Sequence, residues 1–264
     1  MQQQSKGFVT LAGAGPGDAD LITLKLQKRL ATADVIITDR LVNPDIISRN
    51  AGKDVIVIQA GKQGYNDASV PQESINDLIV QHALHGKNVL RLKGGDVAFF
   101  SNVLDELYAL KEHEIEFEII PGITAAAGAS AYAGIPLTAR GFSQSVHFVT
   151  FNPNSSYSPE KWKQFAACND TLVFYMAAKN ITDLAELLLR YSKRPLTAIA
   201  VIEQATTAHQ QVHVSNLKNC AADFSNKSFG SPSLVIIGDV VNLHAKFNWF
   251  GLKEDGSVFK ELAV

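Results

Sequence analysis

Short β-type runs alternate with helical patterns through the first half of this 264-residue chain, and this alternation restricts its fold more than any other feature. The helical patterns place leucine and isoleucine on one face over residues 21–30, 75–82 and 103–114. The β-type runs between them fall at residues 8–12, 35–38, 55–58, 89–92 and 117–120. Strands separated by helices predict parallel pairing, and therefore an α/β fold.

The regular alternation stops near Pro121–Gly122, and the second half has a different pattern. A run of small residues over 124–133 suits a tightly packed helix, and two further helices are predicted over 159–167 and 181–191. We therefore expect two α/β domains, residues 1–122 and 123–264. Further β-type runs of the second domain fall at residues 146–151, 171–176, 198–203, 211–214 and 233–238.

Composition limits the class of function. Hydrophobic residues make up 46% of the chain and charged residues 19%, which is enough for a sizeable core. The formal net charge of -2 argues against nucleic acid as the main partner, because phosphate binding needs a basic excess. Cys168 and Cys220 are too few for a disulfide framework. Since the start is polar and no apolar stretch approaches roughly 20 residues, we expect a soluble cytoplasmic protein without a membrane partner.

A glycine-rich turn, Gly13–Asp18, separates the first β-run from the first helical pattern. Such a turn brings backbone close to a ligand, and Asp39 lies where a ribose-binding acid of a dinucleotide site would be. The detail argues against an NAD-dependent oxidoreductase. Asp18 occupies the position of the third small residue, where a carboxylate repels pyrophosphate, and Pro16 removes a backbone donor. A ligand that is not anionic fits better.

A second glycine pair, Gly94–Gly95, follows the β-run at 89–92 and precedes Asp96. In open α/β sheets, ligands collect beyond the carboxyl ends of the strands. Two glycine turns that each end in an acid after neighbouring strands therefore predict one shared ligand site. The alternative is two unrelated loops with local Asp turns.

Seven motifs occur in order: Gly13–Asp18, Asp39–Val42, Gly61–Lys62, Val70–Glu73, Leu92–Asp96, Pro121–Ala125 and Ala131–Thr138. In order and approximate spacing this set, over about residues 8–245, resembles the uroporphyrinogen-III C-methyltransferases of the tetrapyrrole methylase family. The resemblance implies two α/β domains with the active site in the cleft between them, and usually a homodimer. It also implies S-adenosyl-L-methionine as cofactor, released as S-adenosyl-L-homocysteine, and a tetrapyrrole as substrate.

The resemblance implies a cofactor site built from both domains. From the second domain, Met176 is expected near the adenine, and Ala205 stands where the family often has glycine. From the first domain, the implied cofactor-binding residues are Pro16, Gly94, Gly95, Asp96 and Phe99, and Thr124 and Ala125 are implied to contact the cofactor from the interdomain side.

The resemblance also implies catalytic roles for Asp39, which matches the proposed proton acceptor, and Lys62, which matches the proposed proton donor or substrate-orienting lysine. The acceptor is an electron-rich pyrrole carbon, and after its methylation a proton must be lost elsewhere in the ring system; a carboxylate can take that proton. Arg40, Lys93 and Arg140 are, with Lys62, candidates for binding the carboxylates of the substrate.

One stretch departs from the family pattern. The family follows Gly-Gly-Asp with Pro-Phe-hydrophobic-Phe-Gly-Arg-Gly-Gly-Glu-Glu, whereas this chain keeps Phe100 and Glu106 but has Asn102 in place of the arginine. Val103 and Leu104 replace the two glycines. A lost charge-assisted contact is worth on the order of 1.5–3 kcal/mol. The cofactor motifs are therefore better preserved than the substrate motifs.

The leading hypothesis is C-methylation of uroporphyrinogen III to precorrin-2, by way of precorrin-1, for sirohaem or cobalamin biosynthesis. The altered stretch keeps two alternatives open: another precorrin or tetrapyrrole methyltransferase of the same fold, and a cofactor-binding paralogue with weak activity. No metal site is expected, because His209 and His213 are four residues apart on a β-rich stretch and so lie far apart along one face. The acidic positions within residues 112–118 are expected to form a solvated face.

Overall fold

The computed structural model of this protein describes residues 5–60, 72–153, 157–251 and 256–259. The chain forms two compact units. The N-terminal unit consists of Met1–Ala125 with Ser257–Val264, and the C-terminal unit of Ala126–Gly256. The expected domain division between residues 122 and 123 stays a prediction. Within the described residues, every helix is too short or too polar to cross a membrane.

The N-terminal unit contains a five-stranded sheet in the order β3-β2-β4-β1-β5. Every pairing in it is parallel; Val9, for example, lies beside both Val89 and Phe117. The parallel pairing predicted from the alternation is therefore confirmed in this unit. The strands are β1 (Val9–Gly13), β2 (Val35–Thr38), β3 (Ile56–Gln59), β4 (Val89–Lys93) and β5 (Phe117–Ile120).

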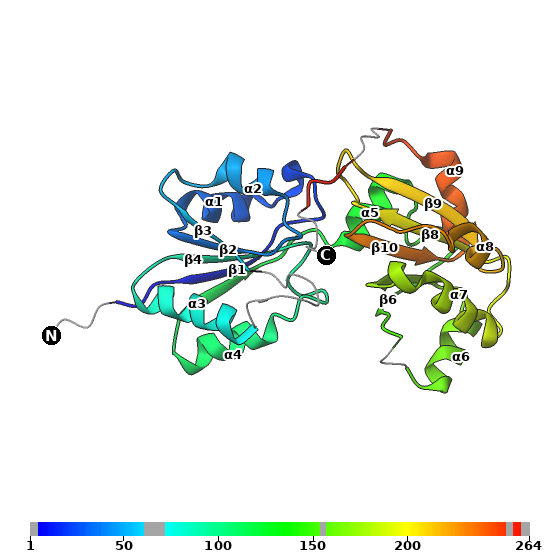
Figure 1. Ribbon diagram of the computed structural model, residues 1–264, viewed down its shortest axis with the longest axis horizontal. Helices are drawn as coiled ribbons and strands as arrows, with labels where there is room; N and C mark the ends of the chain where they lie inside the picture. The colour runs from blue at the N-terminus through cyan, green and yellow to red at the C-terminus, as the bar shows by residue number, and fades with distance from the viewer. Residues whose placement is uncertain (1–4, 61–71, 154–156, 252–255, 260–264) are drawn as a thin grey trace. The chain divides into compact units, whose positions relative to one another are not determined.

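Helices cover both faces of this first sheet, as Figure 1 shows. Ile36 of β2 packs in the cluster that contains residues of α1 and α2, whereas its neighbours Val35 and Ile37 pack with residues of α3 and α4. This alternation follows from the period-2 direction of strand side chains, and it explains why the strands are apolar throughout. The helices are η1 (Ala19–Leu21), α1 (Leu24–Thr32), α2 (Pro44–Asn50), α3 (Gln72–Leu84) and α4 (Leu104–Glu112).

Two local features differ from the sequence interpretation. Helix α2 was not predicted, although Asn43 caps it by accepting from the Asp45 amide and Pro44 occupies its first turn. Glu118 of β5 does not belong to a solvated face. Its side chain is 16% exposed and binds Lys25 at 2.6 Å, and Arg29 donates to it as well.

The C-terminal unit contains a second five-stranded sheet, in the order β6-β7-β10-β8-β9. Only β6 and β7 pair in parallel, and the other neighbours are antiparallel. The expected α/β class holds for the chain, but this sheet is mixed. Its strands are β6 (Val146–Thr150), β7 (Thr171–Tyr175), β8 (Ala198–Glu203), β9 (Gln211–Asn216) and β10 (Ser233–Ile237).

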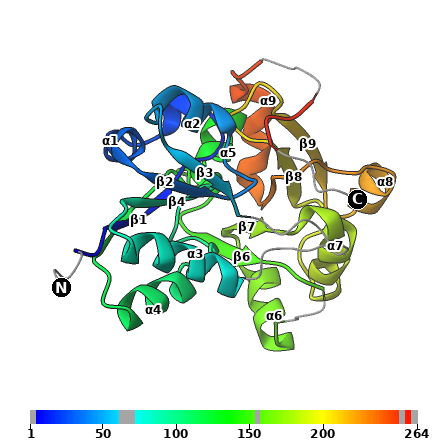
Figure 2. The ribbon, with the colours of Figure 1, turned by 60° about the vertical axis from the view of Figure 1, so that its left-hand side comes forward.

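The second sheet is also covered on both faces (Figures 1 and 2). Trp162, Leu184 and Phe224 bring α6, α7 and α8 onto one face, and Ala129 and Val240 bring α5 and η3 onto the other. The small residues of α5 let it pack closely against the sheet, as the sequence suggested. The helices are α5 (Ala125–Ala133), α6 (Pro159–Ala167), η2 (Ala178–Asn180), α7 (Ile181–Arg190), α8 (Cys220–Phe224), η3 (Asp239–Leu243) and α9 (His244–Phe247).

Candidate functional site

The two glycine turns lie directly against each other at the carboxyl edge of the first sheet. Gly15 N donates to Gly95 O at 3.0 Å, and Gly95 N donates back to Gly15 O at 2.8 Å. Ala14 N also donates to Lys93 O at 2.7 Å. The two turns therefore form one structure, although about 80 residues separate them in the chain.

A third turn, at Pro121–Gly122, joins the first two through the carboxylate of Asp96. Asp96 Oδ2 accepts from Gly122 N at 2.7 Å, and Oδ1 accepts from Ala98 N at 2.8 Å. The carboxylate is buried. A buried carboxylate is stable only when it is paired or hydrogen-bonded, and here backbone amides serve that need. We call the joined turns 13–18, 94–96 and 121–125 the glycine bends.

Steric fit explains the glycines of these bends. A methyl group on Gly13 would lie 2.5 Å from Gly95 O, and one on Gly122 would lie 2.2 Å from the same oxygen. A methyl group on Gly94 would lie 2.8 Å from Leu41 O. Gly95 has a φ of +69°, and a methyl group on it would lie 3.7 Å from Ala125 N. The backbones of the bends are therefore in direct contact, which leaves no room for a side chain at Gly13, Gly94 or Gly122. Ala125 lies beside the Gly94–Gly95 turn.

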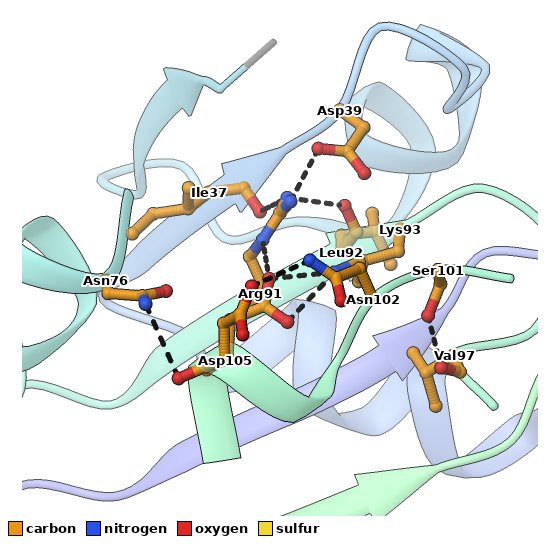
Figure 3. A network of polar contacts seen from close by, with 11 residues as sticks. Ile37, Asp39, Asn76, Arg91, Leu92, Lys93, Val97, Ser101, Asn102 and Asp105 are labelled. Carbon is orange, nitrogen blue, oxygen red and sulfur yellow. Dashed lines mark hydrogen bonds and ion pairs between the residues drawn. The ribbon is translucent and has the colours of Figure 1, made fainter. Parts of the chain in front are cut away.

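A buried network of four charged side chains lies beside the glycine bends (Figure 3). Glu106 of α4 is fully buried and accepts from Arg91 Nε at 3.1 Å and from Lys93 Nζ at 2.8 and 2.9 Å. Arg91, 2% exposed, also donates through Nη2 to Asp39 Oδ1 at 2.6 Å. Two cations and two anions compensate each other, so the network satisfies the usual condition for buried charge.

This network gives Lys93 a different role from the one that the sequence predicted. Lys93 was expected to bind substrate, but its ammonium is buried and donates to both oxygens of Glu106. The structure therefore gives no support to substrate binding by Lys93. Sequence reasoning missed Arg91, although a charged residue inside an apolar β-run needs a partner, and the retained acid at position 106 was available.

Asp39 stands immediately after β2, with its side chain 29% exposed. Arg91 occupies Oδ1, and among the described residues no donor reaches Oδ2. The neighbouring Arg40 is half-buried; burial lowers the pKa of its guanidinium, and the nearby Asp39 carboxylate raises it. The site thus places one accessible carboxylate oxygen beside a partly desolvated cation.

The loop that follows Asp96 is held mainly by side-chain hydrogen bonds, together with one backbone bond from Phe99 N to Asp96 O at 3.3 Å. Phe100 and Asn102 have positive φ angles of 53° and 51°, a conformation that asparagine tolerates and phenylalanine rarely adopts. Asn102 Nδ2 donates to Asp105 Oδ2 at 2.7 Å, and Ser101 Oγ donates to Val97 O (Figure 3). We call residues 97–104 the variable loop. Phe99 at its start is 39% exposed.

The remaining predicted residues have the following positions. Pro16 is buried in the first bend, and Thr124 is half-buried in the third. Arg140 is exposed in the C-terminal unit, in the turn between Ala139 and Ser143. Lys62 lies outside the described residues.

Met176 and Ala205 belong to one edge of the second sheet, because β7 and β8 both run antiparallel to the strand between them, β10. Met176 is exposed and has a φ of +60°. Ala205 is buried between Gln204 and Thr206, whose φ angles of 45° and 70° are also positive. Such backbone outliers concentrate at functional sites, so this edge is a candidate ligand contact.

A parallel sheet that carries joined glycine bends and a carboxylate at its carboxyl edge is typical of α/β proteins, in which ligands collect beyond that edge. The chain belongs to the family described as tetrapyrrole (corrin/porphyrin) methylases, whose family model matches residues 9–221.

Comparison with individual proteins leads to the same family. The chain is 42% identical over 247 residues to a sirohaem synthase of Saccharophagus degradans, and 44% identical over 245 residues to one of Actinobacillus succinogenes. These alignments cover 94% and 93% of the chain but only 54% and 51% of the relatives, so the chain spans about half their length. A uroporphyrin-III C-methyltransferase structure from Thermus thermophilus, complexed with S-adenyl homocysteine, is 31% identical with a TM-score of 0.75. That match covers 90% of this chain and all of the Thermus chain.

Proposed function

We propose that this protein uses S-adenosyl-L-methionine to methylate two ring carbons of uroporphyrinogen III, giving precorrin-2 by way of precorrin-1. The product would serve sirohaem or cobalamin biosynthesis. The observation that carries the proposal is the joining of the glycine bends around Asp96. The similarity to the Thermus transferase, which is complexed with S-adenyl homocysteine, and to sirohaem synthases supports it. We also propose a cytoplasmic homodimer.

The chemistry of the bends fits a sulfonium cofactor better than a pyrophosphate. Asp96 contributes negative charge, and the basic side chain just before the second bend, Lys93, is bound to Glu106. Bound here, S-adenosyl-L-methionine would supply an electrophilic methyl group. The residues proposed to hold it are Pro16, Gly94, Gly95, Asp96, Phe99, Thr124 and Ala125, with Met176 and Ala205 of the C-terminal unit.

Asp39 is the proposed proton acceptor. Methylation leaves the ring carbon with no hydrogen, so the substrate must release a proton from another position, and Asp39 Oδ2 is available for it while Arg91 holds Oδ1. Glu106 fixes the other side of Arg91, so the buried network sets the orientation of Asp39. A carboxylate held in this way needs no rearrangement before it accepts the proton, which is how positioning contributes to rate. Lys62 remains the proposed proton donor or substrate-orienting lysine.

Arg40 and Arg140 are the proposed partners of the substrate carboxylates, because a guanidinium can bind a carboxylate through two parallel hydrogen bonds. Arg40 is the better supported of the two, since it neighbours Asp39 and is partly desolvated. The proposal no longer includes Lys93.

A second candidate is methylation of another precorrin or related tetrapyrrole. The variable loop favours it specifically: Asn102, which stands in place of the family's arginine, carries no charge and donates to Asp105. A substrate with a different arrangement of carboxylates would suit this loop.

The test is incubation of uroporphyrinogen III with the protein and S-adenosyl-L-methionine under anaerobic conditions, followed by mass spectrometry. We expect products heavier by one and then two methyl groups. Asp39→Asn keeps an acceptor for Arg91 but removes the base, and should lower turnover by about 10²–10⁴-fold while S-adenosylhomocysteine still binds. Asp54→Asn, at an exposed turn, is the matched control. Absence of any mass gain would remove the leading function, and full turnover by the Asp39 variant would remove its proposed role.

A further inference from the structure

We propose that His147, Cys168 and Asp170 form a binding site for a zinc-like transition-metal ion in the C-terminal unit. One potential ligand atom from each side chain lies within 4.8 Å of the other two. These residues are outside the glycine bends and the buried network, and the methyl-transfer proposal assigns them no role. The inference therefore stands apart from the proposed function.

The fold brings the three residues together at one corner of the second sheet. His147 is the second residue of β6, and Asp170 immediately precedes β7. Because β6 and β7 are parallel, with His147 opposite Leu172, both side chains belong to the same end of this strand pair. Cys168 ends α6, where its amide donates to Gln164 O at 3.1 Å, so it stands two residues before Asp170.

The imidazole and the carboxylate are already held in contact. A ring nitrogen of His147, Nε2, lies 2.9 Å from Asp170 Oδ2, and Ser145 Oγ donates to the other oxygen of Asp170. The His147 side chain is 40% exposed and that of Asp170 is 31% exposed. Because β6 is the edge strand of its sheet, an ion can reach this pair from solvent without any opening of the core.

A buried ammonium group holds the backbone around Cys168. Lys193 is buried, and its ammonium donates to the backbone carbonyls of Phe165, at 3.1 Å, and of Cys168. These two bonds fix the backbone that carries the Cys168 thiol. The Cys168 sulfur itself contacts Phe165 O at 3.3 Å.

The donor set selects the class of ion. Thiolate and imidazole suit zinc and similar transition metals, whereas calcium and magnesium prefer oxygen ligands only. Around a tetrahedral zinc ion, ligand atoms lie about 3.3–3.7 Å apart, so the His147–Asp170 pair at 2.9 Å must open slightly, and the longer distances in the cluster, up to 4.8 Å, must shorten by about 1 Å. Rotation of the half-buried Cys168 side chain permits this movement. Three protein ligands leave a fourth position for water.

The experiment is titration of the untagged protein with Co²⁺ and then with Zn²⁺. We expect one Co²⁺ per chain, with the near-ultraviolet absorption of a thiolate–cobalt bond, and displacement of that signal by Zn²⁺. Cys168→Ser should abolish the absorption band. His147→Gln and Asp170→Asn should each weaken Co²⁺ binding by at least about tenfold. Loss of a residue that only supports a metal ligand already costs about that much, and these two residues are proposed as ligands themselves. Cys220→Ser and His209→Gln are the matched controls, since both residues lie outside the cluster.

Two results would overturn the proposal: no stoichiometric Co²⁺ binding by the intact protein, or binding that is unchanged in all three cluster variants. Circular dichroism of each variant without metal separates loss of the site from loss of the fold. Calorimetry with S-adenosylhomocysteine on the same samples reports on the glycine bends, so a failure of the metal site and a failure of the proposed function are distinguishable.

Discussion

The variable loop directly follows the second glycine bend in the chain, yet the bends and the loop are built in different ways. The bends are joined by reciprocal backbone hydrogen bonds between Gly15 and Gly95 and by the buried carboxylate of Asp96. The loop at 97–104 has exposed aromatic side chains, two positive φ angles and hydrogen bonds made largely by its own side chains. Contacts between backbones tolerate almost no side chain, whereas exposed side chains can change at little cost.

This difference matches the pattern of resemblance to the family. The motifs of the bends are preserved, and the loop is where the arginine and two glycines of the family are absent. We infer that the proposed cofactor contacts are constrained by packing of the chain against itself, while the proposed substrate contacts are free to vary. Three substitutions test this contrast, and a fourth, outside both regions, gives a reference for a surface charge.

Glu106→Gln should have the largest effect, because Glu106 ties α4, just after the variable loop, to Arg91 and Lys93 of the strand that leads into the second bend. The change leaves two buried cations with less compensation, and we expect the free energy of unfolding to fall by about 3–5 kcal/mol. Urea denaturation measures it, with the exposed Glu112→Gln in the same helix as control. An unfolding midpoint equal to that of the control would show that the network does not link loop and bends.

Gly122→Ala should have the next largest effect. The added methyl group would lie 2.2 Å from Gly95 O, so the bends must move apart, at a cost of about 1–3 kcal/mol in unfolding free energy. Binding of S-adenosylhomocysteine should weaken as well. Gly251→Ala is the matched control, because no atom of the described residues lies within 4 Å of the methyl position there. If both variants bind equally well, the close approach of backbones is not what shapes the site.

Asn102→Arg tests the variable loop. At a φ of +51° arginine is less favourable than asparagine, and the change also removes the hydrogen bond to Asp105, so we expect a loss of roughly 1–2 kcal/mol in stability. If the loop meets the substrate, the added charge should lower KM for uroporphyrinogen III about tenfold or more. Steady-state kinetics and urea denaturation together separate the two effects. A KM that does not change would place substrate recognition elsewhere.

Glu118→Gln, outside both regions, should have the smallest effect. Burial raises the pKa of the Glu118 carboxyl, but hydrogen bonds and charges from Lys25 and Arg29 lower it by more, so the net shift is downward. A group whose pKa is lowered by folding stabilises the fold above its unfolded-state pKa and loses that contribution as pH falls through its folded pKa. We expect a loss of about 0.2–1 kcal/mol near pH 7 that disappears in acid. A loss that is independent of pH would point to packing instead.

Much of the fold could be predicted from local sequence. The strands at Val35–Thr38 and Phe117–Ile120 and the helix Pro159–Ala167 occur over the predicted residues, since their periodicity and caps are local properties. The short helices α2 and α8 were missed, because a helix of five to seven residues gives little periodic signal. Strand direction in the second sheet depends on long-range pairing, which no local pattern encodes.

The site divides in the same way. The bends were predictable because glycine next to an acid after a strand has a direct steric and chemical meaning. The shared partner of Arg91 and Lys93 could not be predicted. Glu106 is 15 residues from Arg91 and 13 from Lys93 in the chain, and only the packing of α4 on the sheet brings it to them. The cluster of His147, Cys168 and Asp170 escaped notice for a similar reason, since parallel pairing of β6 and β7 is needed to bring its members together.

Calorimetric titration of the protein with S-adenosylhomocysteine and, separately, with NAD⁺ tests the central claim most directly. If the joined bends form a site for a sulfonium cofactor and its thioether product, S-adenosylhomocysteine binds with one site per chain and NAD⁺ gives no binding heat. Binding of NAD⁺ without binding of S-adenosylhomocysteine would contradict the account.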